Sequence, residues 1–80
     1  MKPNSIGRYV VADPKVCHGQ LTFRGTRILV SDVLELVAAG TPWEKIIDEC
    51  HGSISRKAIA EAIRLAGRML TQRVERPVSA

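Results

Sequence analysis

The chain has 80 residues, of which 45% are hydrophobic, and a formal net charge of +4. This length predicts one domain with a core near the lower limit for independent folding, so pairing with another chain would add stability. The sequence holds no apolar run near the ~20 residues that cross a bilayer, and no apolar segment follows Met1 as in a signal peptide. Two cysteines do not make a disulfide framework. We therefore expect a cytoplasmic protein.

Charge is distributed unevenly along the sequence. Residues 1–29 carry five basic side chains and one acidic one, residues 30–52 carry one basic and five acidic, and residues 53–80 carry six basic and two acidic. The formal charges of these segments are therefore +4, −4 and +4. The basic ends would meet a polyanionic partner. The alternative is that the acidic middle attracts the basic ends within one subunit or between subunits.

The first 30 residues predict short strands. Tyr9–Ala12 is β-branched and aromatic enough for a strand, and Pro14 ends it or makes it an edge. As an edge strand it is a candidate for pairing between two copies of the chain. Leu21–Phe23 and Arg27–Val30 are expected to form a hairpin around Arg24-Gly25-Thr26, because apolar side chains alternate and Gly25 tolerates a positive φ.

Three helices are predicted to follow. Ser31 is expected to cap the first helix with its hydroxyl, and Gly40 is expected to end it. Thr41-Pro42-Trp43-Glu44 has the pattern of a capping box with proline at the first helical position, opening a second helix that Gly52 closes. Ser55 is expected to cap a third helix that runs to about Gln72.

The third helix has the clearest amphipathic pattern. At about 100° per residue, one half of its circumference is apolar and the other half is polar. The apolar half comprises Ala58, Ile59, Ala62, Ile63, Leu65, Ala66, Met69 and Leu70, and the polar half includes Arg56, Lys57, Glu61, Arg64 and Arg68. The predicted fold is therefore mainly α: a β extension over residues 6–30, a three-helix bundle over 31–72 and a loose tail over 73–80, all in one domain.

Three helices with tight connections are typical of helix-turn-helix, homeodomain-like bundles. In that geometry the third helix reads DNA. We therefore expect DNA contacts from its basic face, which carries Arg56, Lys57, Arg64 and Arg68, because these side chains bind phosphates and arginine also pairs with guanine. The alternative is a basic helix face that is simply solvated.

Two further residue groups are candidates for partner contact. Arg24 and Arg27 flank the expected hairpin tip and could meet a phosphate or a protein partner; the alternative is that both arginines are only solvated. Trp43 is the only tryptophan. It is expected to anchor helix packing, although such aromatic residues are also frequent in binding hot spots.

The sequence gives little support to catalysis or metal binding. Cys17-His18 and Cys50-His51 supply potential zinc ligands, but structural zinc sites usually use C-x₂₋₄-C or H-x₃₋₅-H spacing. No base or oxyanion hole accompanies Cys17 as a nucleophile. A carboxylate metal site would need Asp13, Asp32, Glu35 and Asp48, three of which are better explained as turn or helix-start residues. We therefore expect no enzyme activity, no catalytic residues, no metal and no cofactor.

A family resemblance covers roughly residues 7–70. The motifs that carry it are Asp13-Pro14, Cys17-His18-Gly19, Arg24-Gly25-Thr26-Arg27-Ile28, Ser31-Asp32-Val33-Leu34 and Ala39-Gly40. At this spacing they resemble the domain of unknown function family 433. The chain departs from the family at Leu21, where many members have proline, and at His51-Gly52-Ser53, where a Tyr-Pro-type turn is common.

The resemblance implies a homeodomain-like fold and a function. Members resemble VapB-type antitoxins, which are encoded beside a small PIN-like nuclease-fold toxin. We therefore expect an antitoxin of a type II toxin-antitoxin pair, a transcription regulator that forms a homodimer, neutralises the PIN-like toxin and binds double-stranded operator DNA. The alternative is a protein-protein interaction module that does not bind DNA.

Overall fold

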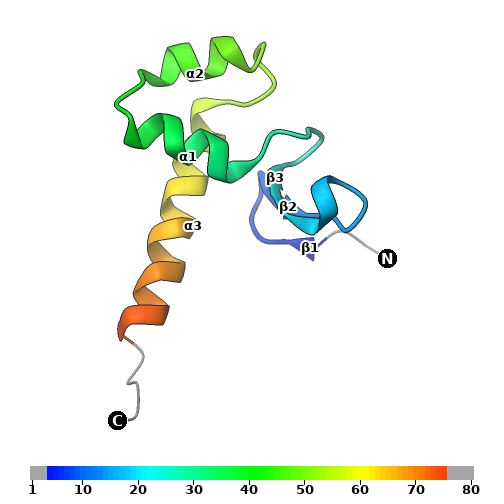
Figure 1. Cartoon of the computed structure of the whole chain (residues 1–80), viewed down its shortest axis with the longest axis vertical. Helices are drawn as coiled ribbons and strands as arrows, with labels where there is room; N and C mark the ends of the chain where they lie inside the picture. Colours follow the sequence, from blue (N-terminus) through cyan, green and yellow to red (C-terminus); the bar gives the residue numbers. More distant parts are fainter. Residues whose placement is uncertain (1–3, 76–80) are drawn as a thin grey trace.

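In the computed structural model, which describes residues 4–75, a small N-terminal sheet precedes three helices (Figure 1). The strands are β1 (Asn4–Ser5), β2 (Val10–Ala12) and β3 (Leu21–Phe23), and the 3₁₀ turn η1 (Cys17–Gly19) lies between β2 and β3. The helices are α1 (Val30–Ala38), α2 (Trp43–Glu49) and α3 (Arg56–Glu75). The chain therefore has the predicted mainly α fold with a short β extension. Most of the predicted loose tail, residues 76–80, lies outside the described residues.

The sheet is antiparallel, with the strand order β1-β2-β3. Val10 is paired with Phe23 and Ala12 with Leu21 on one side of β2, while Ala12 faces Asn4 of β1 on the other side. The expectation that Tyr9–Ala12 is an edge strand is therefore wrong, because β2 is bonded on both sides. Pairing between copies of the chain cannot use this strand without displacing β1.

The expected strand Arg27–Val30 does not form. The turn at residues 24–26 is present, with Gly25 at φ 78°, but the Thr26 hydroxyl donates to the Phe23 carbonyl at 2.8 Å and accepts the Ile28 N–H at 3.0 Å. That N–H is therefore unavailable for a strand ladder. Only Leu29 makes an isolated bridge, to Thr22, and helix α1 already begins at Val30.

Of the three N-terminal caps that the sequence predicts, only one is present in the structure. Leu29, not Ser31, is the N-cap of α1 and makes no side-chain cap bond, so Ser31 lies exposed within the helix. The capping box at Thr41 is also wrong, because Pro42 is the N-cap of α2 and the Thr41 N–H instead closes α1 on the Leu36 carbonyl at 3.0 Å. At α3 the expected cap is present: the Ser55 hydroxyl accepts the Ala58 N–H at 3.2 Å.

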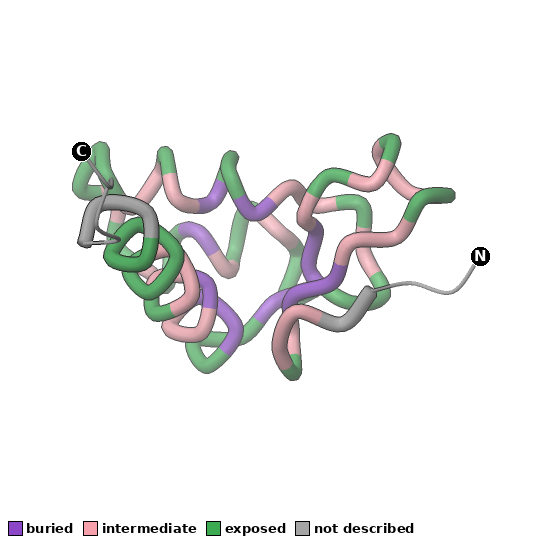
Figure 2. Tube along the Cα trace, turned by 90° about the horizontal axis from the view of Figure 1, so that it is seen from below, coloured by how far each residue is buried: buried purple, intermediate pink, exposed green. Residues whose placement is uncertain are grey.

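The hydrophobic core lies where the three helices meet the sheet, as the buried segments in Figure 2 show. Its largest fully buried apolar side chains are Phe23 from β3, Val10 from β2, Val33 from α1, Ile46 from α2 and Ile59 from α3. Strands β2 and β3 and all three helices therefore contribute a buried anchor, and the sheet is part of the core rather than an appendage.

Helix α3 is longer than the core requires. Ala58, Ile59 and Ala62 in its first half are buried, whereas Met69 and Leu70 in its second half are exposed. Figure 1 shows this second half extending away from α1, α2 and the sheet. The helix continues to Glu75, three residues beyond its predicted end at Gln72. Within residues 4–75, no helix is long and apolar enough to cross a membrane.

Candidate nucleic-acid interface

Three of the predicted DNA-binding side chains lie on one stripe of α3. Lys57, Arg64 and Arg68 are all exposed. Separations of seven and four residues bring them within about 40° of one another around the helix, and the stripe is about 16 Å long. The structure therefore presents a row of three positive charges on a regular helix.

Arg56 is placed differently from the other three. Its guanidinium forms an ion pair with Glu44 at the start of α2 and lies over the Trp43 ring, 5.4 Å from the ring centroid. The pKa of Glu44 is lowered, first by its backbone hydrogen bond at the helix start and then by Arg56. Arg56 therefore joins α2 to α3, and because 58% of its side chain is still exposed, it also leaves a positive charge accessible at the start of α3.

The connection between α2 and α3 is short. The Gly52 N–H closes α2 on the Ile47 carbonyl at 3.0 Å, and His51 takes a left-handed φ of 54°. Ile54 then enters the core, where it is 5% exposed, before Ser55 caps α3. The start of α3 is therefore fixed against α2 by a buried side chain, a cap and the Arg56 contacts.

The carboxylate of Glu61 holds the N-terminal segment against α3. Its Oε1 accepts the N–H groups of Tyr9 at 2.7 Å and Val10 at 3.1 Å, and its Oε2 accepts the N–H of Arg8 at 3.0 Å. A Cβ on Gly7 would lie 2.5 Å from Oε1, so only glycine leaves room for this carboxylate. The sequence pattern placed Glu61 on the polar half of the helix. It did not predict this contact, in which the carboxylate binds backbone N–H groups of a distant segment.

This arrangement brings an unpredicted arginine to α3. Arg8 is exposed, its backbone N–H is bonded to Glu61, and its guanidinium lies over the Tyr9 ring at 5.9 Å. Glu61 lies only about 40° around α3 from Lys57 and one turn before Arg64. Arg8 therefore borders the basic stripe. The only signal for it in the sequence was the positive charge of the first 29 residues, because residues 6–9 have no periodic pattern.

Arg24 supports the same segment rather than projecting alone from a hairpin tip. Its Nε donates to the Arg8 carbonyl at 3.0 Å and one terminal NH₂ donates to the Gly7 carbonyl at 3.3 Å. Arg27 is exposed and borders a shallow hollow that is lined entirely by residues from 11–27. The structure therefore brings Arg24, but not Arg27, toward the basic surface on α3.

The two Cys-His pairs have local roles. Cys17 and His18 both take left-handed φ values, 49° and 57°, in the turn η1, and the Cys17 Sγ donates to the Arg27 carbonyl at 3.7 Å. Burial, and then the nearby Glu49, raise the pKa of the Cys50 thiol. In the part of the chain that the structure describes, no three His, Cys, Asp or Glu side chains lie close enough together to hold a metal ion.

Comparison with known proteins gives one match. The family described as "Protein of unknown function (DUF433)" matches residues 10–66. No curated protein and no solved structure matches the chain. The matched residues extend from Val10, the first residue of β2, to Ala66 within α3. They include all of α1 and α2 as well as Glu61 and Arg64. The chain therefore belongs to the DUF433 family.

Proposed function

We propose that this protein is a DNA-binding antitoxin of a type II toxin-antitoxin pair. The observation that carries the DNA-binding part is the exposed stripe of Lys57, Arg64 and Arg68 on α3. This helix follows α2 after a tight turn, the arrangement in which a helix-turn-helix protein places its second helix in the major groove. We infer that α3 is the reading helix and that α2 crosses the backbone beside it.

The charges of α3 suit both phosphate binding and contact with base edges. Lysine and arginine on a continuous stripe neutralise phosphates, which supplies affinity that falls as salt is raised. Residues at the start of a reading helix reach base edges, and here those residues include Arg56 and Lys57. Arg8 is positioned by Glu61 to add a further phosphate contact at the edge of the same surface.

The toxin-binding part of the proposal is supported by the resemblance to VapB-type antitoxins. In this mechanism the protein covers the active site of a PIN-like nuclease-fold toxin, and a homodimer of the antitoxin carries the complex to operator DNA. The alternative, a protein-protein interaction module without DNA binding, fits the same fold but leaves the basic stripe without a partner.

DNA binding can be tested with the purified protein and a labelled duplex from the region upstream of its gene. Arg64→Ala/Arg68→Ala is compared with Lys15→Ala/Arg27→Ala, which removes the same charge from exposed positions outside α3. The stripe variant is expected to lose at least about tenfold in affinity and to lower the salt slope by about two, because two phosphate contacts are removed. The control is expected to stay within about threefold of the wild type.

Two results would contradict the DNA-binding proposal. One is the absence of wild-type binding even at low salt, which favours the interaction-module alternative. The other is an equal loss in both double variants, which means that net charge rather than the α3 stripe governs affinity. The toxin part is tested separately by co-expression with the product of the adjacent gene. A complex that survives size-exclusion chromatography and suppresses the nuclease activity of that product is the expected result.

A further inference from the structure

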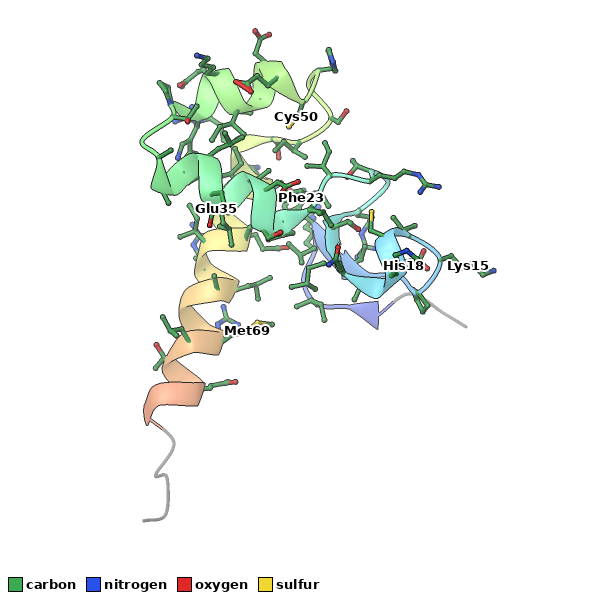
Figure 3. The ribbon with its side chains drawn as sticks, viewed as in Figure 1. Lys15, His18, Phe23, Glu35, Cys50 and Met69 are labelled. Atoms are coloured by element: carbon green, nitrogen blue, oxygen red, sulfur yellow. The ribbon has the colours of Figure 1, made fainter. Side chains whose placement is uncertain are left out.

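An apolar corner lies between the second half of α3, the N-terminal sheet and α1. Ile6 and Leu21 contribute from the sheet side, Leu34 from α1, and Leu65 and Met69 from α3. These side chains surround an open hollow of about 80 Å³. Figure 3 shows the Met69 side chain projecting from α3 toward the side on which the sheet lies. The corner is therefore a groove with apolar walls that runs beside the projecting part of α3.

The same part of α3 carries exposed apolar side chains. Met69 is 44% exposed and Leu70 is 65% exposed. They continue the stripe that starts at buried Ala62 and passes Leu65. Exposed apolar surface beside an apolar groove marks an interaction site.

We propose that a second copy of this chain occupies the corner, with the two α3 helices packed antiparallel about a two-fold axis close to residue 68. In this arrangement Met69 and Leu70 of each copy fill the groove beside Leu65 of the other, as a self-complementary interface requires. The inference deepens the proposed function, and its DNA-related part rests on that function.

Charge favours a second copy as the occupant. Residues 30–52, which contain α1 and α2, have a formal charge of −4, whereas residues 53–80 have +4. Antiparallel packing brings the basic C-terminal part of one α3 toward α1 of the other copy, which carries the exposed Glu35. Because of the two-fold symmetry, the basic part of each α3 is attracted in the same way to α1 of the other copy.

The proposed two-fold axis also sets where the two basic stripes lie and how far apart they are. The basic stripe lies about 130° around α3 from the apolar stripe. A two-fold axis perpendicular to both helices leaves both basic stripes on one side of the dimer. Lys57 is eleven residues from the axis, so at about 1.5 Å per residue the two copies of Lys57 lie about 33 Å apart along the helices. This separation is close to the ~34 Å between half-sites one DNA turn apart.

Sedimentation equilibrium and circular dichroism of the full chain test the interface. Leu70→Glu and Met69→Glu each place a charge in the proposed seam, and Thr71→Glu places the same charge on the neighbouring exposed position away from it. The wild type and Thr71→Glu are expected to be dimers, whereas Leu70→Glu and Met69→Glu are expected to be folded monomers or at least tenfold weaker dimers. Met69→Cys, mildly oxidised, is expected to cross-link to a dimer, with the wild type reporting any cross-linking through Cys17 or Cys50.

A monomeric wild type, or Leu70→Glu and Met69→Glu chains that dimerise like the wild type, would overturn the inference. A partner protein that binds only when Leu70 is intact, with the free chain monomeric, would also overturn it and assign the corner to that protein. Failure of the proposed dimer interface is distinguishable from failure of the proposed function. Dimers that bind no DNA leave the interface standing, whereas monomers that bind operator DNA as tightly as the wild type leave DNA binding standing.

Discussion

Replacement of Glu61 tests whether one carboxylate joins the N-terminal sheet to α3. Glu61→Ala removes the acceptor of three backbone N–H groups, and those of Tyr9 and Val10 lie in partly buried bonds. The Arg8 bond is exposed, so water can replace it. A partly buried group that loses a charged acceptor costs about 1–3 kcal/mol. The two partly buried bonds together therefore predict a loss of about 2–6 kcal/mol.

This loss is large for so small a chain. Folded domains are stable by about 0.05–0.15 kcal/mol per residue, which gives about 4–12 kcal/mol for 80 residues. A loss of about 2–6 kcal/mol lowers the melting temperature of such a domain by at least about 8 °C, because each kcal/mol corresponds to about 4–8 °C. Glu61→Gln is expected to fall between the wild type and Glu61→Ala, because its amide oxygen can still accept two of the bonds while its NH₂ group opposes the Arg8 N–H.

Urea denaturation and amide hydrogen exchange measure these effects. Glu49→Ala is the matched control, since it removes the same charge from an exposed position at the end of α2 and is expected to stay within about 0.5 kcal/mol of the wild type. In Glu61→Ala the amides of Tyr9 and Val10 are expected to lose protection first. If Glu61→Ala and Glu49→Ala are equally stable, the carboxylate does not hold the sheet to α3.

Three further changes follow from individual contacts. Gly7→Ala is expected to destabilise the chain and to weaken protection at Tyr9, because the new Cβ would lie 2.5 Å from the Glu61 Oε1; differential scanning calorimetry measures the shift. Ser55→Ala removes the cap of α3 and is expected to cost about 1 kcal/mol in urea denaturation, while exposed Ser31→Ala changes little. Because the folded pKa of Cys50 is raised, its contribution to stability is full below the ordinary thiol pKa and is lost as pH rises through the folded value. A Cys50→Ala variant is expected to lose less stability than the wild type between about pH 8 and 10, and identical pH profiles would contradict this.

The amphipathic pattern of α3 was sufficient to predict its existence, its cap and its exposed basic residues. Lys57, Arg64 and Arg68 recur at helical spacing, and this period depends only on local geometry. Two of the failures involve competition for one backbone group. The Thr41 N–H closes α1 instead of opening α2, and the Thr26 hydroxyl takes the N–H that a strand at Arg27–Val30 needed. The sequence alone does not say which of two local partners wins.

The contacts that complete the candidate site could not be predicted for a different reason. Glu61 and Tyr9 are 52 residues apart, and no local pattern links a carboxylate on a helix to backbone N–H groups of an irregular segment. The same limit applies to Arg8, which reaches the basic surface only because Glu61 and Arg24 hold its backbone. The sequence therefore predicts which face of α3 is basic, whereas tertiary contacts decide which distant residues join that face.

The length of α3 connects the two proposals. A helix that served only the core could end near Ala66, since residues 67–72 are all exposed. Most helix stability in proteins comes from packing of an apolar face, and an isolated segment of this length is marginal in water. The proposed dimer accounts for the continuation past Met69 and Leu70 to Glu75, because a second α3 would supply a packing surface that carries the same pattern. Since the proposed two-fold axis lies close to residue 68 and Lys57 lies near the start of the same helix, the proposed dimer contact and the spacing of the proposed DNA contacts are set by one element.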